Sequence, residues 1–485
     1  MNPLVFKNLT LFLLLTLSFS LLSQSKIDSL KHELNYSSND TTTLSIYGLI
    51  GDDFYYKGEN DSAIFYWELA KEFALTSQKK EFSEIYKFVI NKKLSVFFND
   101  LAYLNVEKGN FNTAIEYFHE CILLKQSIND SRGETNTYTN LGYLYIKKRD
   151  LDSALFYNLA AHKLAKTNNF EEIEAASAVQ LGLIFTEIGE INQALAYLNK
   201  SVIYFSSNND TLELAKSYNN IAKSYQKLND YNTALEFYFK SLELKIKLGN
   251  KKSSATAYNN IGACYFKIDE LELAVKYNKK ALDLFIEIQD KIGEATTLNN
   301  IGFMHYQMNE MEEALSIYTK SLAIRESISD IEGIAFSLLN ISKIHSFDAN
   351  YNEALFLLQK VYKLALETKN IELLSDCSLQ LSLNYEKIKD NQRALSHYKK
   401  HIYYQNKLNN NSNIDKARHI NAIIKIQQQN YKDSISLVIQ SRNEVKSLEQ
   451  EIRESSFIVS KKYTYIFLFG LALLIGLLIY KKILP

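Results

Sequence analysis

The chain has 485 residues, with 55 lysines and arginines and 55 aspartates and glutamates, so its formal net charge is zero. That balance gives no indication of a nucleic-acid partner, which would favour an excess of positive charge. Its 2 prolines, Pro3 and Pro485, lie at the chain ends, and an interior without helix breakers indicates an all-helical protein. The 3 cysteines fit neither a disulfide framework nor a CxxC metal site, and each is predicted to be a small packed residue.

Residues 1–23 are typical of a secretory signal peptide. One basic residue, Lys7, precedes a mainly apolar run from Leu9 to Leu22 that ends among serines. An uncleaved signal anchor is the alternative. Either interpretation places the residues that follow outside the cytoplasm.

A short pattern then returns every 40 residues. It consists of asparagine or glutamine, then leucine or isoleucine, then a small residue, as in Asn140-Leu141-Gly142. An alanine recurs at the same interval from Ala114 to Ala394, after a first copy at Ala63. A fixed period of this length indicates stacked copies of one supersecondary unit, so we expect a solenoid rather than globular domains.

Each unit is predicted to hold two helices. In the unit from about 132 to 168, Tyr138, Leu141 and Tyr145 lie at i, i+3 and i+7, which is one apolar stripe at helical period. A polar turn follows, and Ala154 belongs to the second helix. The first two repeated alanines are 51 residues apart, 11 more than the period, which predicts a longer helix at about 81–107.

These features resemble the tetratricopeptide repeat. The resemblance rests on the Leu141-Gly142 pair, an aromatic three residues later (Tyr145), and the alanine of the second helix. It implies an all-α, right-handed solenoid of about nine helix-turn-helix repeats over residues 26–410. The 40-residue unit is longer than the family's usual 34, and the family's terminal proline is absent.

The repeated asparagine lies on the helix face opposite the apolar stripe, at 100° per residue. In the resembled family this face lines a concave groove, where such asparagines can hydrogen-bond the backbone of an extended peptide. By that resemblance a ladder is expected from Asn140, Asn220, Asn260, Asn300 and Asn340. The alternative is that these amides bond the neighbouring helix and only support repeat stacking.

A basic patch is predicted beside this ladder, at Lys216, Lys223, Lys227 and Lys267. Such a patch could capture a carboxylate or another anionic group, although a solvated lysine face is the alternative. No motif for phosphate binding, metal-dependent hydrolysis or nucleophilic catalysis occurs, so we expect neither an enzyme nor a cofactor or metal.

The pattern changes after residue 410. Residues 411–462 are predicted to form a helical stalk with Val438, Val445, Ile452 and Val459 at every seventh position. That spacing favours either a short coiled coil, and with it a homodimer, or a single capping helix. Residues 463–480 carry no charge and would span about 27 Å as a transmembrane helix, followed by a cytoplasmic tail at 481–485.

Together these segments predict a single-pass membrane protein with its repeats outside the cytoplasm. The order of segments resembles the extracytoplasmic half of bacterial tetratricopeptide sensor proteins. The function expected first is an anchored scaffold that binds a protein or extended peptide in its groove. The alternative is a sensor or receptor subunit that passes an event in the repeats across the membrane to a separate kinase or regulator.

Overall fold

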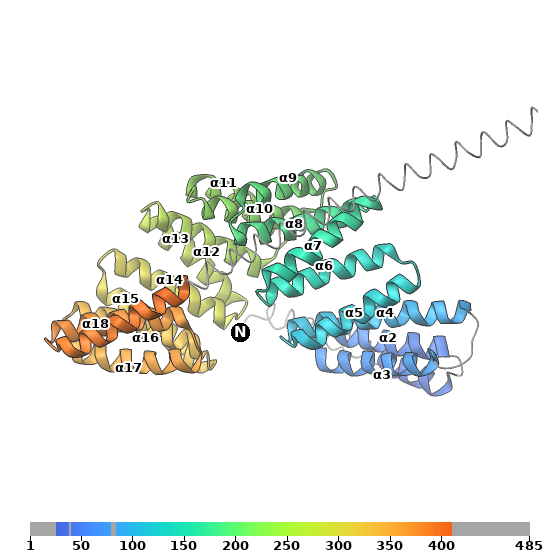
Figure 1. The fold of residues 1–485 in the computed structure, drawn as a ribbon, viewed down its shortest axis with the longest axis horizontal. Helices are drawn as coiled ribbons and strands as arrows, with labels where there is room; N and C mark the ends of the chain where they lie inside the picture. The colour runs from blue at the N-terminus through green and yellow to red at the C-terminus, as the bar shows by residue number, and fades with distance from the viewer. Residues whose placement is uncertain (1–25, 38–39, 79–83, 410–485) are drawn as a thin grey trace, which may run out of the picture. The chain divides into compact units, whose positions relative to one another are not determined.

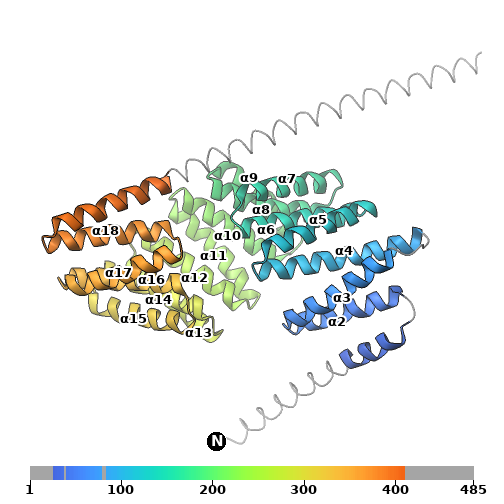
Figure 2. The same cartoon turned by 60° about the horizontal axis from the view of Figure 1, so that its bottom comes forward.

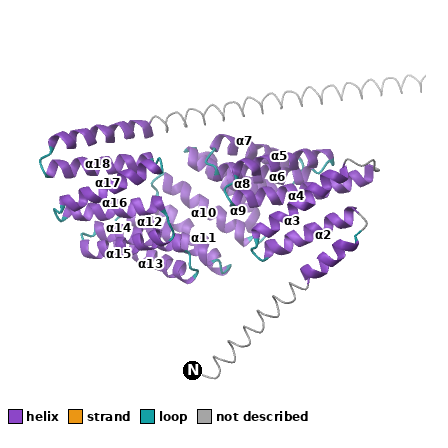
Figure 3. Ribbon diagram, turned by 90° about the horizontal axis from the view of Figure 1, so that it is seen from below, coloured by secondary structure: helices purple, strands orange, loops and turns teal. Residues whose placement is uncertain are grey.

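The structure is a computed structural model, and it describes residues 26–37, 40–78 and 84–409. All of them belong to one compact unit, Met1–Lys416. The described residues form helices joined by short turns, with no strand among them (Figure 3). The predicted signal peptide (1–23), stalk (411–462), transmembrane helix (463–480) and tail (481–485) lie outside the described residues.

The helices follow one another in pairs (Figure 1). A helix at 26–36 precedes the first pair, and the described part of the last pair ends with a helix at 391–409. The helices between them are α2 (Asp40–Tyr56), α3 (Asn60–Gln78), α4 (Glu84–Glu107), α5 (Phe111–Ser127), α6 (Ser131–Lys147), α7 (Leu151–Thr167), α8 (Glu171–Ile188), α9 (Ile191–Ser207), α10 (Thr211–Lys227), α11 (Tyr231–Lys247), α12 (Lys251–Lys267), α13 (Leu271–Glu287), α14 (Lys291–Gln307), α15 (Met311–Ser327), α16 (Ile331–Phe347), α17 (Tyr351–Glu367) and α18 (Ile371–Lys387).

These pairs are the repeats predicted from the sequence. Within the described ranges there are nine of them, from α2 with α3 to α18 with the helix at 391–409. Most helices have 17 residues, whereas α4 has 24, which is the longer helix that the insertion predicted. Each even-numbered helix packs on the odd-numbered helix that follows it, and most even-numbered helices also contact the next even-numbered one, such as α8 with α10 (Figure 2). The even-numbered helices therefore share one face of the stack.

The turns resemble one another because a residue in the left-handed conformation follows most helices, and a side-chain cap starts many of them. At the turn after α10, Asn229 adopts a left-handed conformation with φ of 61°. The backbone amide of Asp230 then donates to the carbonyl oxygen of Tyr225 at 3.0 Å, which satisfies an end group of the helix. The Asp230 carboxylate accepts from the backbone amide of Thr233 at 3.1 Å, which caps α11.

Replacing Asp230 with alanine removes this cap. We expect the unfolding free energy to fall by about 1 kcal/mol, which is the usual cost of losing an N-terminal cap. Urea denaturation followed by circular dichroism measures the change. Asp230→Asn keeps an acceptor oxygen and should leave the urea midpoint nearly unchanged; an equal loss in both variants would contradict the capping role.

The core between the helices is built from the repeated small and apolar residues. Leu141 and Ala154 are fully buried, and Gly142 lies against Asn158 of the partner helix. An aromatic ring of the first helix also stacks almost parallel on a ring 12 residues later, as Tyr145 does on Tyr157 with 5.4 Å between ring centroids. The same contact recurs in four further repeats, at Phe185/Tyr197, Tyr225/Phe237, Tyr265/Tyr277 and Tyr385/His397. The three cysteines are free and buried, as predicted.

The predicted localisation, a single-pass membrane protein with its repeats outside the cytoplasm, was wrong. In the part of the chain that the structure describes, no helix is both long and apolar enough to cross a bilayer. The physical reason lies in the described repeats: their helices bury an apolar face and expose a polar one, so a continuous apolar run of about 20 residues does not arise within them.

Candidate functional site

The face formed by the even-numbered helices contains a pocket where several repeats meet. This pocket, called here the central pocket, has a volume of about 610 Å³ and draws side chains from α4, α6, α8, α10, α11 and α12. Its lining combines apolar, amide and charged groups. They are Tyr103, Asn140, Tyr143, Ile146, Ala176, Val179, Gln180, Leu183, Glu213, Lys216, Asn219, Asn220, Lys245, Ser253 and Thr256.

Two further pockets adjoin it. One, of about 480 Å³, is lined by residues of α4, α5, α6 and α8 and shares Asn140 and Ala176 with the central pocket. The other, the acidic-aromatic pocket, has about 400 Å³ and shares Tyr103 with it. The acidic-aromatic pocket is lined by Asp52, Tyr55, Tyr56, Trp67, Asn99, Asp100, Tyr103 and Leu104.

The predicted asparagine ladder is only partly gathered in one place. Asn140 and Asn220 line the central pocket, whereas Asn260, Asn300 and Asn340 line none of the three pockets described above. Asn140 donates to the Asn99 side-chain oxygen at 3.0 Å, and Asn340 donates to Asn299 in the same way at 3.0 Å. These bonds join neighbouring repeats, so two of the five amides do support stacking.

One of the repeated asparagines is more buried than the sequence predicted. The sequence placed the repeated asparagine away from the core, but Asn220 is buried, with 8% of its surface exposed. The preceding even-numbered helix, α8, packs against α10 and contributes to this burial, an effect that a wheel drawn for one helix does not contain. The buried amide of Gln180, the glutamine in the same repeat slot as Asn140 and Asn220, has a side-chain oxygen with no hydrogen-bond partner among the described residues.

The four lysines of the predicted basic patch do not lie together either. Lys216 lines the central pocket and pairs with Glu213 at 2.5 Å. Lys227 lies 3.8 Å from Glu187, and Lys267 lies near the Phe266 ring. Lys223 is half-buried near Lys245 and, like Lys227 and Lys267, is outside the three pockets.

A lysine that the sequence analysis missed is the most buried cation of the central pocket. Lys245 comes from α11, an odd-numbered helix, and only 9% of its surface is exposed. Its Nζ donates to the Asn219 side-chain oxygen at 3.1 Å. Burial, together with the nearby charge of Lys223, lowers the pKa of Lys245 to about 8.

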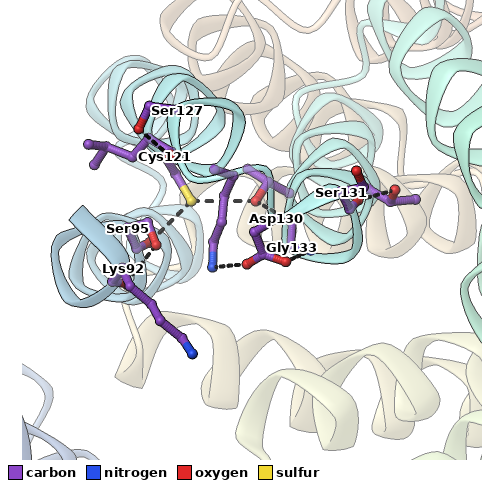
Figure 4. Close-up of polar contacts among 11 residues, drawn as sticks. Lys92, Ser95, Cys121, Ser127, Asp130, Ser131 and Gly133 are labelled. Atoms are coloured by element: carbon purple, nitrogen blue, oxygen red, sulfur yellow. Dashed lines mark hydrogen bonds and ion pairs between the residues drawn. The ribbon is translucent and has the colours of Figure 1, made fainter. Parts of the chain in front are cut away.

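In two other repeats, the cation at the position equivalent to Lys245 is paired with a carboxylate. Lys125 pairs with Asp130 at 2.9 Å, and Asp130 also caps the backbone amide of Gly133 (Figure 4). Arg325 pairs with Asp330 at 3.2 Å in the same arrangement. In the repeat of Lys245 the equivalent acid is replaced by the neutral Asn250. Comparing positions five residues apart across the repeats would have revealed this missing carboxylate.

Stacked helical hairpins with a hollowed common face define a repeat scaffold suited to binding protein segments. Residues 97–128 match a model of the tetratricopeptide repeat, and a second model of the same repeat matches four overlapping windows, 173–247, 213–287, 253–327 and 293–367. The chain is a tetratricopeptide-repeat protein, which confirms the family predicted from the sequence. No curated protein matches it.

Solved structures with the same fold include the apo form of the quorum sensor NprR from B. thuringiensis. It is 16% identical, with a TM-score of 0.53 over 79% of this chain and 98% of that one. A signal transduction ATPase with a tetratricopeptide repeat sensor, from Pyrococcus horikoshii, is 14% identical, with a TM-score of 0.53 over 72% of this chain and 54% of that one. At these identities the likeness shows a shared fold.

Proposed function

We propose that the chain is a binding scaffold without catalytic activity, and that it holds an extended segment of a protein or peptide in the central pocket. The observation that carries this proposal is the lining of the pocket. Apolar side chains such as Val179 and Leu183 alternate there with amides and a buried cation. This mixture suits a peptide, because a peptide offers apolar side chains together with backbone donors and acceptors.

The length of the pocket supports an extended ligand over a compact metabolite. Its lining runs from Tyr103 on α4 to Thr256 on α12 and includes every even-numbered helix between them. The pocket therefore follows several repeats, a shape that suits an extended segment. The amides of Asn140, Gln180 and Asn220 lie along that path and can both donate to and accept from a peptide backbone.

Replacing Asn140 and Asn220 together with alanine should weaken peptide binding at least tenfold, because each lost hydrogen bond contributes about 1 kcal/mol. Peptides selected on the purified chain from a random library provide the ligand, and fluorescence anisotropy measures the dissociation constant.

The repeats offer a matched control. Asn300→Ala with Asn340→Ala makes the same change in the same repeat slot, outside the central pocket, and also removes one amide bond between repeats. This control should retain the affinity of the unchanged chain. Equal losses in both double variants, accompanied by lower melting temperatures, would show that the asparagines act only in stacking.

A second candidate is that binding in the repeats is a sensing event, read by a separate kinase or regulator. The observation that favours it is that both similar structures reported above are of sensors: the quorum sensor NprR, and an ATPase with a tetratricopeptide repeat sensor. Crosslinking of the full chain with and without the selected peptide tests it. A regulator recovered only in the presence of peptide supports sensing, and recovery of the same proteins in both conditions contradicts it.

A further inference from the structure

The acidic-aromatic pocket, formed by α2, α3 and α4, has a chemistry that the central pocket lacks. We propose that it binds an organic cation, the ammonium or guanidinium group of a lysine or arginine side chain, between the carboxylates of Asp52 and Asp100 and the rings around them. This inference goes beyond the proposed function, since it does not require a peptide in the central pocket.

The two carboxylates are held in the pocket without a cation of their own. Asp52 accepts from the indole N–H of Trp67 at 3.1 Å, and Asp100 accepts from the side-chain amide of Asn99 at 3.2 Å. Both partners are neutral, and among the described residues neither carboxylate forms an ion pair. The lysines whose charges act on these carboxylates are already engaged: Lys26, near Asp52, contacts Asp53 at 3.5 Å, and Lys125, near Asp100, pairs with Asp130 at 2.9 Å.

The remaining walls present aromatic rings. Tyr55 packs against Trp67 and against Tyr56, with 5.9 Å between ring centroids in each contact. Tyr103 closes the side formed by α4. A ring face carries negative electrostatic potential and attracts a cation, and the exposed rings of Tyr55 and Tyr103 are accessible to one that enters from solvent.

Elsewhere the chain supplies its own cations to such rings. Lys240 lies 4.6 Å from the centroid of the Phe237 ring, and Lys360 lies 4.2 Å from that of Phe356. Over the part of the chain that the structure describes, no lysine or arginine lies over the rings of the acidic-aromatic pocket. The pocket thus combines two features that attract a cation, and neither is satisfied from within the described chain.

The electrostatics agree with this geometry. Burial, reinforced by the charge of Asp52 and opposed by the Asn99 hydrogen bond and by Lys125, raises the pKa of Asp100 to about 6. Burial also raises the pKa of Asp52, although the Trp67 hydrogen bond and Lys26 oppose the rise. Burial, the main cause in both cases, disfavours the charged form of each carboxylate, and an incoming cation would offset that cost.

Trp67 is the only tryptophan of the chain, so its fluorescence reports directly on this pocket. The purified full chain is titrated with N-acetyl-lysine methylamide and N-acetyl-arginine methylamide, and with N-acetyl-norleucine methylamide as a neutral probe of similar shape to the lysine derivative. We expect both cations to change the Trp67 emission saturably and the neutral probe to bind at least tenfold more weakly. Equal binding of all three probes would show an apolar pocket and overturn the proposal.

Asp52→Asn and Asp100→Asn should each weaken cation binding about tenfold while leaving the weak binding of the neutral probe unchanged. Asp283→Asn makes the same chemical change on the exposed side of α13 and serves as the control. Isothermal titration calorimetry repeats the measurement independently of Trp67. Unchanged affinity in both pocket variants would overturn the proposal.

The unchanged chain provides a further test if a variant fails to fold. Protonation of Asp100 removes charge from the site, so affinity for both cations should fall at least fivefold between pH 7 and pH 5. The charged and titratable groups that act on Asp100 or share its surroundings are Asp52 on α2 and Cys121 and Lys125 on α5. Lys26 acts on Asp52, and the groups around Tyr103 on the same side of the pocket are Tyr55, Glu107, Tyr143 and Lys147. Affinity that stays constant over this range would contradict a role for the carboxylates.

Discussion

Replacing Lys245 with methionine is expected to stabilise the fold at pH 7 by about 2 kcal/mol. The pKa of Lys245 is lowered from 10.5 to about 8, so the folded state holds the charged lysine less favourably than the unfolded state does. A shift of that size corresponds to at most about 3 kcal/mol. Losing the hydrogen bond to Asn219 reduces the gain by about 1 kcal/mol, and methionine fills the space of the lysine stem.

The pH dependence identifies the cause. Below pH 8 Lys245 is charged in both the folded and the unfolded state, and burying that charge lowers the unfolding free energy by its full amount. Between pH 8 and 10.5 the folded state loses the proton while the unfolded state keeps it, so the unchanged chain gains stability as pH rises. The advantage of Lys245→Met should therefore shrink across that window. Urea midpoints from pH 7 to pH 10.5 measure it, and a constant advantage would mean that packing, not charge, is responsible.

Lys125→Met is the matched control, and its expected sign is opposite. Burial alone would raise the pKa of Asp130, but the hydrogen bonds from Lys125 and from the Gly133 backbone amide bring it below its usual value. Removing Lys125 leaves that carboxylate half-buried without its partner, so stability should fall by about 1 to 2 kcal/mol. If both lysine variants changed stability in the same direction, the missing carboxylate opposite Lys245 would not be the cause.

Replacing Gly262 with valine is expected to destabilise the chain by about 3 kcal/mol. A Cβ at this position would overlap the side-chain amide of Asn278 and lie 3.1 Å from the backbone carbonyl oxygen of Ala274. The Asn278 amide is fully buried and donates to that same carbonyl at 2.9 Å. The valine side chain must therefore either break the hydrogen bond from Asn278 to Ala274 or separate α12 from α13. Thermal and urea denaturation measure the loss.

Gly262→Ala decides between two opposing effects. Helix propensity alone predicts a gain of about 1 kcal/mol, whereas overlap with Asn278 predicts a loss. Combining it with Asn278→Ala removes the obstacle and should recover most of the lost stability. Thr256→Val, on the exposed side of α12, should leave the urea midpoint within about 0.5 kcal/mol of the unchanged chain. A stabilising Gly262→Ala would show that the helices can separate at little cost.

The fold could be predicted because one packing solution repeats. Leu141, Gly142 and Ala154 lie where two helices touch, and the same requirement returns every 40 residues. The longer α4 was also foreseeable, since an insertion of three turns keeps a helix face in register. By contrast, Tyr145 and Tyr157 stack across two helices. The apolar stripe of a single helix does not indicate such a contact.

The site was less predictable because it depends on several repeats at once. The predicted asparagines share one repeat slot, but only Asn140 and Asn220 meet in the central pocket. Lys245 was not predicted because it belongs to the second helix of its repeat, whereas the predicted basic patch lies on first helices. Asp52 and Asp100 belong to repeats on either side of the 11-residue insertion, where the 40-residue register is interrupted, so no periodic pattern connects them.

The pairwise packing of the helices has a consequence for how binding would be felt along the chain. Each helix mainly contacts its immediate neighbours, so stability accumulates from nearest-neighbour terms and the repeats need not unfold in a single transition. A ligand that contacts helices from α4 to α12 would join separately fluctuating repeats into one cooperative block. Occupancy of the central pocket would thereby determine which backbone amides exchange with solvent together, including amides that lie far from the ligand.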